Sequence, residues 1–189
     1  MIVYLHGFCS SPQSSKARRL KSHMEARGLG RLFRCEQLPP SPGAAIRLAE
    51  RQIAAARTPV TVVGSSLGGY YATHLAEKHR LKAVLVNPAV VAHISLAGFV
   101  GPQTNLYTGE TFDFRPEYID ELRALEVPRI SRPRDFLLLV ESGDEVLDYR
   151  QAVAKYAGAR QVVLEGGDHS FTRWDDHLDT ILEFAGLLK

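Results

Sequence analysis

The sequence of 189 residues predicts an α/β fold with a mostly parallel, six-stranded sheet that helices cover on both faces. Short runs rich in Val, Leu and Ile alternate with stretches whose apolar residues recur at helical spacing, from one end of the chain to the other. A hydrophobic content of 45% is enough for a substantial core, so we expect a single domain over residues 1–189. One long connection, residues 89–134, interrupts the alternation and is expected to be a lid-like insertion.

Six runs have the length and composition of strands. The first is a short apolar run followed closely by a glycine, and the second alternates only weakly, which places it at or near an edge of the sheet. The later runs are almost continuously apolar, which is typical of strands that are buried on both faces. In chain order, the predicted strands are residues 2–5, 32–38, 60–63, 83–86, 136–140 and 161–164.

Five stretches between and after these strands predict helices. Ala17, Leu20 and Met24 share one face of the first stretch, and the second is rich in alanine. In chain order, the predicted helices are residues 14–27, 43–56, 67–79, 145–157 and 173–188. Right-handed crossovers between parallel strands would bring the carboxyl ends of the strands to one edge of the sheet, where ligands bind in such folds.

The composition makes several functional classes poor candidates. The net charge is +2 and no basic run stands out, so we expect no nucleic-acid partner. No apolar run exceeds the length of a strand and none resembles a signal peptide, so we expect a cytoplasmic protein without a membrane partner. Cys9 and Cys35 belong to no metal-binding or redox motif and are expected to be free thiols, and we expect neither a metal nor a cofactor.

The sharpest motif is the pentapeptide GSSLG at residues 64–68, which fits G-x-S-x-G with Ser66 at its centre. It lies directly between a predicted buried strand and a predicted helix. A tight turn here would push the serine hydroxyl out of the sheet, and the N-terminus of the helix would favour negative charge beside it. Ser66 is therefore the predicted nucleophile of an α/β-hydrolase fold; the alternative is a glycine-serine loop that only caps a helix.

A serine nucleophile needs a base that takes its proton and an acid that orients the base. In the α/β-hydrolase fold the acid and then the histidine follow the serine in the chain, each on a loop after a strand. Asp144 and His169 occur in this order, each just past a predicted strand. Asp144 is the preferred acid because Gly143 permits a sharp turn before it. The alternative acids nearby are Glu141, Glu145 and Asp148.

The loop after the first strand, His6-Gly7-Phe8, is placed to complete an oxyanion hole. In this fold that loop supplies one backbone N–H, and the residue after the nucleophile supplies the other. Phe8 and Leu67 are therefore the predicted donors. His6 precedes the loop glycine, so we expect it to brace the loop by hydrogen bonding rather than to act as the base.

The insertion 89–134 is rich in glycine and proline and has no clear periodicity. Some of its apolar side chains are candidates to line an acyl pocket, although most are expected only to pack the insertion onto the domain. His93, also in the insertion, is a candidate substrate contact. The candidate lining residues are Ile94, Leu96, Phe99, Val100, Leu106, Tyr107, Phe112 and Phe114.

Six segments together resemble the YqiA-like bacterial esterases, and the resemblance spans nearly the whole chain. They are YLHGF (4–8), GSSLGGYYA (64–72), VNPA (86–89), YTG (107–109), SGDEVLDYR (142–150) and EGGDHSF (165–171). The resemblance implies an α/β-hydrolase fold and esterase activity, with thioesters such as acyl-CoA as a further substrate class, and a triad of Ser66, Asp144 and His169. Cys9 departs from the pattern, which has a polar, asparagine-like residue at this position.

The sequence therefore predicts a serine esterase that acts on a small-molecule ester or thioester by two-step acyl transfer. Because an imidazole base must be neutral to take a proton, activity is expected to rise with pH between about 6 and 7. Two alternatives use the same residues differently: an acyltransferase or thioesterase with the same triad, and a non-catalytic binding protein on a hydrolase scaffold. Neither the physiological substrate nor the oligomeric state follows from the sequence.

Overall fold

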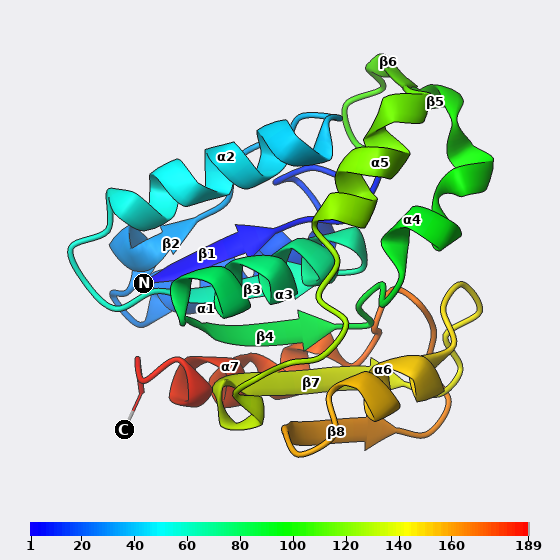
Figure 1. Ribbon diagram of the computed structural model, residues 1–189. Coiled ribbons are helices and arrows are strands. Elements are labelled where there is room, and N and C mark those ends of the chain that lie inside the picture. Colours follow the sequence, from blue (N-terminus) through cyan, green and yellow to red (C-terminus); the bar gives the residue numbers. More distant parts are fainter. Residues whose placement is uncertain (189) are drawn as a thin grey trace.

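The computed structural model describes residues 1–188; Lys189, the last residue of the domain expected over 1–189, lies outside the described residues. A six-stranded sheet in the order β2-β1-β3-β4-β7-β8 runs through the molecule, and all of its strand pairs are parallel (Figure 1). The strands are β1 Ile2–Leu5, β2 Phe33–Arg34, β3 Thr61–Ser65, β4 Lys82–Val86, β7 Phe136–Glu141 and β8 Arg160–Leu164. The predicted parallel sheet is confirmed, with β2 at one of its edges.

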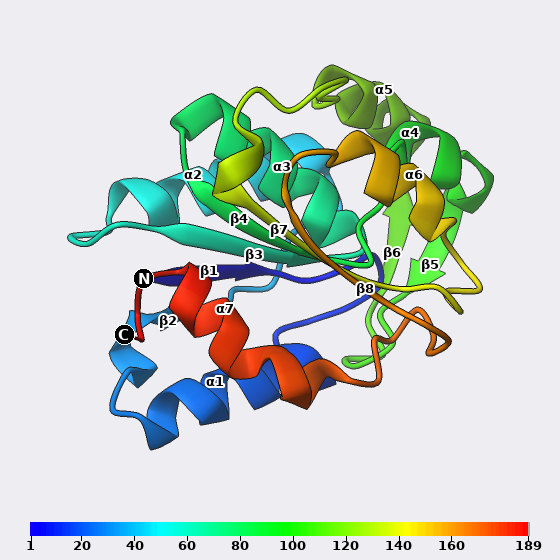
Figure 2. The same ribbon diagram turned by 90° about the horizontal axis from the view of Figure 1, so that it is seen from below.

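Helices cover both faces of the sheet, as Figure 2 shows. The helices α1 Ser15–Ala26 and α7 Leu178–Phe184 lie on one face, and the other face carries α2 Pro42–Ala54, α3 Leu67–His79 and α6 Tyr149–Lys155. Successive side chains of a strand point to opposite faces, so Ile2 and Tyr4 belong to the core under α1 and α7, whereas Val3 belongs to the core under the other helices. This double burial explains why the strands are apolar without alternation.

The strand order changes direction at β1, which lies between β2 on one side and β3 on the other. Ile2 is in register with Phe33 of β2 and with Thr61 of β3. The loops that follow β1 and β3 therefore leave the sheet at a topological switch point, where parallel sheets open a crevice for ligands.

The insertion is more regular than the sequence predicts. It contains the short helix α4 Ala92–Ser95, a hairpin of β5 Gly101–Thr104 and β6 Thr111–Phe114, and the helix α5 Pro116–Ala124. The two strands of four residues are too short to produce a recognisable period. Pro116 at the first helical position is a helix-start signal that points to α5.

Three predicted elements differ markedly from those in the structure. The strand expected over 32–38 is reduced to the two residues of β2. The helix expected over 145–157 begins at Tyr149, because the preceding residues form a turn around Asp144 and the side chain of Asp148 caps the helix at Arg150 N. The closing helix expected over 173–188 divides into a 3₁₀ turn, Trp174–His177, and α7.

Within residues 1–188, no helix combines the length and the apolar character that crossing a membrane requires.

Candidate active site

Ser66 occupies a strained turn between β3 and α3. Its backbone has φ 55° and ψ −122°, a region that a residue with a side chain rarely adopts. The two flanking glycines permit this turn: a Cβ at Gly64 would lie 2.1 Å from the carbonyl oxygen of Gly68, and a Cβ at Gly68 would lie 1.9 Å from that of Leu5. The turn thus presents the Ser66 hydroxyl above the carboxyl edge of the sheet.

The structure brings Ser66, His169 and Asp144 together in one hydrogen-bonded chain. His169 Nε2 lies 3.1 Å from Ser66 Oγ, and His169 Nδ1 lies 2.8 Å and 3.0 Å from the two Asp144 carboxylate oxygens. A carboxylate accepts only, so Nδ1 donates to Asp144 and the lone pair of Nε2 faces the serine hydroxyl. The side chain of Asp144 is 1% exposed and that of His169 is 21% exposed.

Asp144 is held by its own loop as well as by His169. Its Oδ1 accepts hydrogen bonds from the backbone N–H groups of Val146, at 2.9 Å, and Leu147, at 2.8 Å. Burial by itself would raise the pKa of the Asp144 carboxyl, but the bonds from His169 and these two N–H groups outweigh it, so the pKa lies below its ordinary value. Asp144 therefore stays ionised and can stabilise a positive charge on His169.

The alternative acids have other partners. Glu145 Oε2 accepts from the backbone N–H of His169, at 3.0 Å, and not from its ring. Asp148 caps α6 by accepting from the N–H of Arg150. Among the four carboxylates considered in the sequence, Asp144 is the one in contact with the imidazole.

Glu141, considered in the sequence only as an alternative acid, instead holds the loop that carries His169. The fully buried carboxylate accepts hydrogen bonds from the N–H groups of Asp168, at 2.9 Å, and Thr172, at 3.2 Å, and from Arg173 Nε, at 2.9 Å. Burial by itself would raise the pKa of Glu141, but these bonds keep it below its ordinary value. The available signal in the sequence is a carboxylate directly after the apolar run FLLLV.

Asn87 is a second positioning residue that the sequence does not single out on chemical grounds. It follows β4, is buried, and adopts a positive φ of 39°. Its Nδ2 donates to the carbonyl oxygens of Asp168, at 3.0 Å, and His169, at 3.2 Å, and its Oδ1 accepts from the N–H of Glu141. Asn87 thus ties the end of β7 to the His169 loop from the neighbouring strand.

The loop after β1 lies against the nucleophile. A Cβ added at Gly7 would lie 3.3 Å from Ser66 Cβ and 3.8 Å from its Oγ. No group within residues 1–188 accepts a hydrogen bond from the backbone N–H of Phe8 or of Leu67, so both donors are available to an oxyanion.

His6 lies beneath the oxyanion loop rather than at the nucleophile. Its Nε2 accepts from the N–H of Leu38 at 3.0 Å, so the neutral ring carries its proton on Nδ1, which faces the carbonyl oxygen of Gly7 at 3.0 Å. Burial lowers the pKa of His6, which keeps the ring neutral.

Two cavities open onto Ser66 and His169. The apolar cavity, of about 420 Å³, is lined mainly by Phe8, Leu67, Ala89, Leu96, Phe99 and Leu147. The second cavity, of about 370 Å³, is called the polar cavity because Ser14, Lys16 and Arg19 line it, although Phe171 and Trp174 line it too. A third cavity, of about 470 Å³, is lined by the oxyanion loop and part of the insertion and does not include Ser66.

The apolar residues of the insertion divide among these cavities and the core. Leu96 and Phe99 line the apolar cavity, Leu106 and Tyr107 the polar cavity, and Phe112 the third cavity. Phe114 is buried against Phe8, whereas Ile94 and Val100 are exposed and line none of the three. The insertion therefore forms walls of both cavities that reach the nucleophile.

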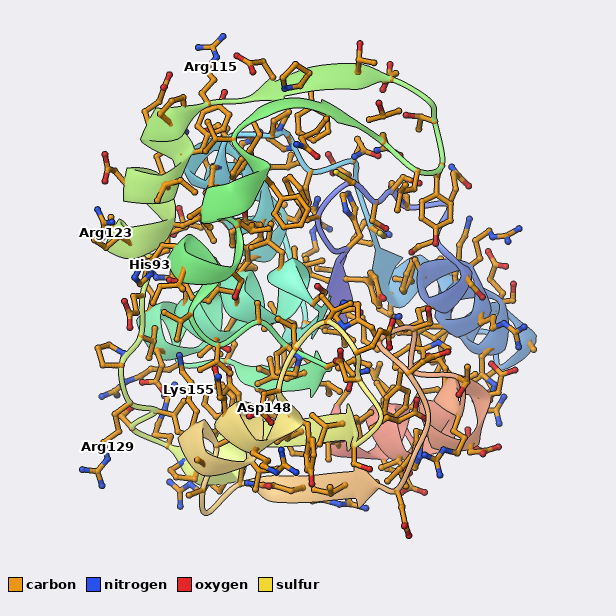
Figure 3. The ribbon with its side chains drawn as sticks, turned by 90° about the vertical axis from the view of Figure 1, so that its right-hand side faces the viewer. His93, Arg115, Arg123, Arg129, Asp148 and Lys155 are labelled. Atoms are coloured by element: carbon orange, nitrogen blue, oxygen red, sulfur yellow. The ribbon has the colours of Figure 1, made fainter. Side chains whose placement is uncertain are left out.

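His93 lies away from these cavities. Its Nδ1 is 3.5 Å from a carboxylate oxygen of Glu126. Figure 3, which faces the carboxyl edge of the sheet, shows His93 on the flank of the insertion, where α4 contacts α5. The structure thus does not place His93 where a substrate at Ser66 would touch it.

In the part of the chain that the structure describes, no group of three or more His, Cys, Asp or Glu side chains is arranged to hold a metal ion. Cys9 and Cys35 are both free and half-buried.

Comparison with known proteins supports the fold and the relationship. The uncharacterised protein family UPF0227 matches residues 1–186, which confirms the resemblance found in the sequence. The monoacylglycerol lipase of Paleococcus ferrophilus is similar over 99% of this chain and 94% of its own, with a TM-score of 0.74 and 16% identity.

Two further solved structures agree. The mouse α/β-hydrolase domain-containing protein 10 gives a TM-score of 0.71 at 16% identity, over 100% of this chain and 90% of its own. The esterase domain of a Rhodothermus marinus protein gives 0.68 at 19% identity, over 97% and 85%. The α/β-hydrolase fold is thereby confirmed.

Proposed function

This chain belongs to the uncharacterised protein family UPF0227, and from its site we propose that it is a serine hydrolase that cleaves carboxylic esters through an acyl-enzyme intermediate. The observation that carries the proposal is the hydrogen-bonded chain from Asp144 through His169 to Ser66, with contacts of 2.8 Å and 3.1 Å. The esterase and lipase names among proteins of the same fold support the same reaction class.

Acylation begins when Ser66 Oγ attacks the ester carbonyl carbon and its proton passes to His169 Nε2. The carbonyl oxygen becomes an oxyanion, to which the N–H groups of Phe8 and Leu67 donate, and Asp144 stabilises the imidazolium. The tetrahedral intermediate then collapses: the bond to the leaving oxygen breaks, and His169 gives its proton to the departing alcohol.

Deacylation repeats these steps with water as the nucleophile. His169 takes a proton from water, the hydroxide attacks the acyl carbon, and the bond to Ser66 Oγ breaks as His169 returns a proton to it. The products are a carboxylic acid and the free serine. A thioester would follow the same course with a thiol as the leaving group.

The apolar cavity is suited to bind an uncharged acyl group of the substrate, next to Leu67. Apart from Ser66, Ser95 and His169, its lining side chains are aliphatic or aromatic. Phe8 packs edge-on against Phe99 at a ring separation of 5.7 Å. Burying an acyl chain here would gain about 25 cal/mol for each Å² removed from water. We therefore expect esters with apolar acyl groups to be preferred.

Covalent labelling and turnover test the proposal together. Wild-type protein should react with a fluorophosphonate probe and hydrolyse 4-nitrophenyl acetate, whereas Ser66→Ala should do neither and should unfold at the same temperature. Ser22→Ala, which removes an exposed hydroxyl from α1, is the matched control and should behave as wild type. A well-folded wild-type protein that neither labels nor turns over the ester would favour a binding protein on this fold.

The leaving group distinguishes an esterase from a thioesterase, and the acceptor of the acyl group distinguishes a hydrolase from an acyltransferase. A panel of matched oxygen esters and thioesters, with and without added alcohols, separates hydrolysis from acyl transfer. Release of the free acid in the presence of acceptors supports a hydrolase; predominant formation of new esters would instead make the protein an acyltransferase.

A further inference from the structure

The two cavities at Ser66 differ in chemistry. The apolar cavity suits the acyl group, so the polar cavity remains for the alcohol side of the ester. His169, which protonates the leaving oxygen in the proposed reaction, lines both. The residues of the polar cavity would therefore determine which leaving groups the site accepts.

The N-terminus of α1 forms one wall of the polar cavity. Ser14, Ser15 and Lys16 all line it, and α1 is 12 residues long. Ser14 is the residue before the helix, yet its side chain makes no capping bond, and the first turn holds no acidic residue. No group of residues 1–188 accepts a hydrogen bond from the backbone N–H of Ser15, Lys16 or Ala17. The positive end of the helix dipole is thus uncompensated at the cavity.

The hydroxyl of Ser14 independently indicates a ligand. Ser14 is only 7% exposed, and its Oγ is buried without a hydrogen-bond partner in the part of the chain that the structure describes. Buried hydroxyls almost always have a partner because leaving one unpaired is costly. A polar group of a bound substrate in this cavity would supply that partner.

Lys16 adds a positive charge beside the helix terminus. Its Nζ donates to the carbonyl oxygen of Ser170 at 2.7 Å, next to His169, and forms no ion pair with a described carboxylate. Burial lowers the pKa of Lys16, and the nearby carboxylates of Asp168 and Asp144 partly oppose this. An amine that is partly desolvated and forms no ion pair is suited to bind an anion.

Most other charges near the cavity have partners of their own; the exception is Asp168, the carboxylate that acts most strongly on Lys16, whose Oδ1 is buried without a hydrogen-bond partner among the described residues. Arg19 lines the same wall, but it pairs with Asp175 and donates to Ser15 Oγ. Asp144 is bound by His169 and Glu141 by Arg173, so neither leaves an uncompensated negative charge facing Lys16.

From these features we propose that the polar cavity binds a small anionic group, a carboxylate or a phosphate, carried by the leaving group of the substrate. This inference rests on the proposed ester hydrolysis and extends it. Ser14 Oγ, the N–H groups of the first turn of α1 and Lys16 Nζ are the donors to this anionic group. Such a site fixes the leaving oxygen near His169 Nε2, which promotes its protonation.

The test compares three acetate esters: those of a neutral phenol, a hydroxybenzoate and a hydroxyphenyl phosphate. The readout is the ratio of kcat/KM for each anionic ester to that for the neutral ester, in which any general loss of activity cancels. In Lys16→Met this ratio should fall by about tenfold or more, and Lys16→Arg should restore part of it. Which anionic ester has the higher ratio distinguishes a carboxylate from a phosphate.

Two further variants separate binding from folding. Ser14→Ala removes a hydroxyl that has no protein partner, so it should leave the unfolding temperature unchanged or raise it while lowering the ratio. Lys21→Met, an exposed lysine of α1 paired with Glu25, is the matched control and should leave the ratio unchanged. A ratio that neither Lys16→Met nor Ser14→Ala alters would overturn the anion site.

A direct binding measurement keeps this inference separate from the proposed reaction. In Ser66→Ala, inorganic phosphate and benzoate should shift the amide resonances of residues 15–17 saturably, and adding Lys16→Met should weaken this binding about tenfold or more. Saturable binding to Ser66→Ala, together with no ester turnover by the wild-type protein, would retain the anion site and reject the esterase. Turnover of the neutral ester by the wild-type protein, without saturable binding to Ser66→Ala, would retain the esterase and reject the anion site.

Discussion

At the residue scale, the position of His169 depends on side chains that do not touch Ser66. Glu141 accepts hydrogen bonds from both ends of the His169 loop, at Asp168 and at Arg173, and Asn87 donates to the carbonyl oxygens of Asp168 and His169. A loop held by two buried side chains presents its imidazole without rearrangement, and this preorganisation is what a general base requires.

Replacing the buried carboxylate should weaken both the fold and the reaction. Glu141→Gln keeps one acceptor oxygen but loses the charge and one set of bonds, so the free energy of unfolding should fall by ~1–3 kcal/mol. Because the His169 loop loosens, kcat should fall more than KM changes. Denaturant unfolding and steady-state kinetics measure the two effects. The exposed Glu165→Gln is the control, and an equal loss there would contradict the role assigned to Glu141.

The same variant yields a pH dependence of stability. The pKa of Glu141 is lowered in the folded protein, so its contribution to stability is complete above the unfolded pKa, about 4.3, and is lost as the pH falls through the folded pKa. The difference in unfolding free energy between wild type and Glu141→Gln should therefore be constant near neutral pH and shrink below about pH 4. Urea unfolding from pH 7 to 3 measures it; a difference that grows on acidification would reverse the sign of the shift.

At the element scale, the β3–α3 turn owes its shape to close backbone contacts. The Cα of Gly68 packs so near the carbonyl of Leu5 on β1 that no side chain fits between α3 and the sheet. The same turn contains the strained φ of Ser66 and the start of α3.

A single methyl group tests this packing. Gly68→Ala should displace α3 from the sheet, lower the free energy of unfolding by ~3 kcal/mol or more, and abolish ester turnover. Gly98→Ala is the matched control, since a Cβ there would meet no atom within 4 Å, and it should be neutral in both assays. Thermal unfolding of the two variants gives the comparison; equal melting temperatures would refute the steric account.

At the scale of the whole molecule, the insertion is fastened to the oxyanion loop. Asn105, the residue after β5, is buried and donates to the carbonyl oxygen of Ser10, at 2.8 Å. Leu106 N–H donates to the carbonyl oxygen of Cys9, also at 2.8 Å. The tip of the β5–β6 hairpin, at Leu106 and Tyr107, therefore forms part of the wall of the polar cavity. It also supports the loop that carries the Phe8 donor.

Removing this attachment should affect activity more than stability. Asn105→Ala also frees the N–H groups of Tyr107 and Thr108, so kcat/KM for a neutral ester should fall about tenfold while the free energy of unfolding falls by only ~1–2 kcal/mol. The exposed Thr104→Ala, one residue earlier, is the control. Unchanged kinetics in a correctly folded Asn105→Ala would show that the hairpin tip has no part in the reaction.

Much of the fold could be predicted because burial leaves a local record. Strands covered on both faces must be apolar throughout, and helices on a sheet must be apolar on one side, so the order of elements follows from the sequence. The limits of α6, of the closing helix and of the insertion's elements did not, because a capping side chain, a 3₁₀ turn and a short hairpin leave weak periodic signals.

The sequence by itself determined the parallel sheet, the turn at Ser66, and the order in which Asp144 and His169 follow it, since each depends on neighbouring residues. Only the tertiary structure decided which carboxylate faces the imidazole, that Glu141 and Asn87 hold the His169 loop, and that Lys16 lies beside it, 154 residues from its acceptor Ser170. These contacts join residues far apart in the chain, and their geometry is set by how the elements pack rather than by any pattern along the sequence.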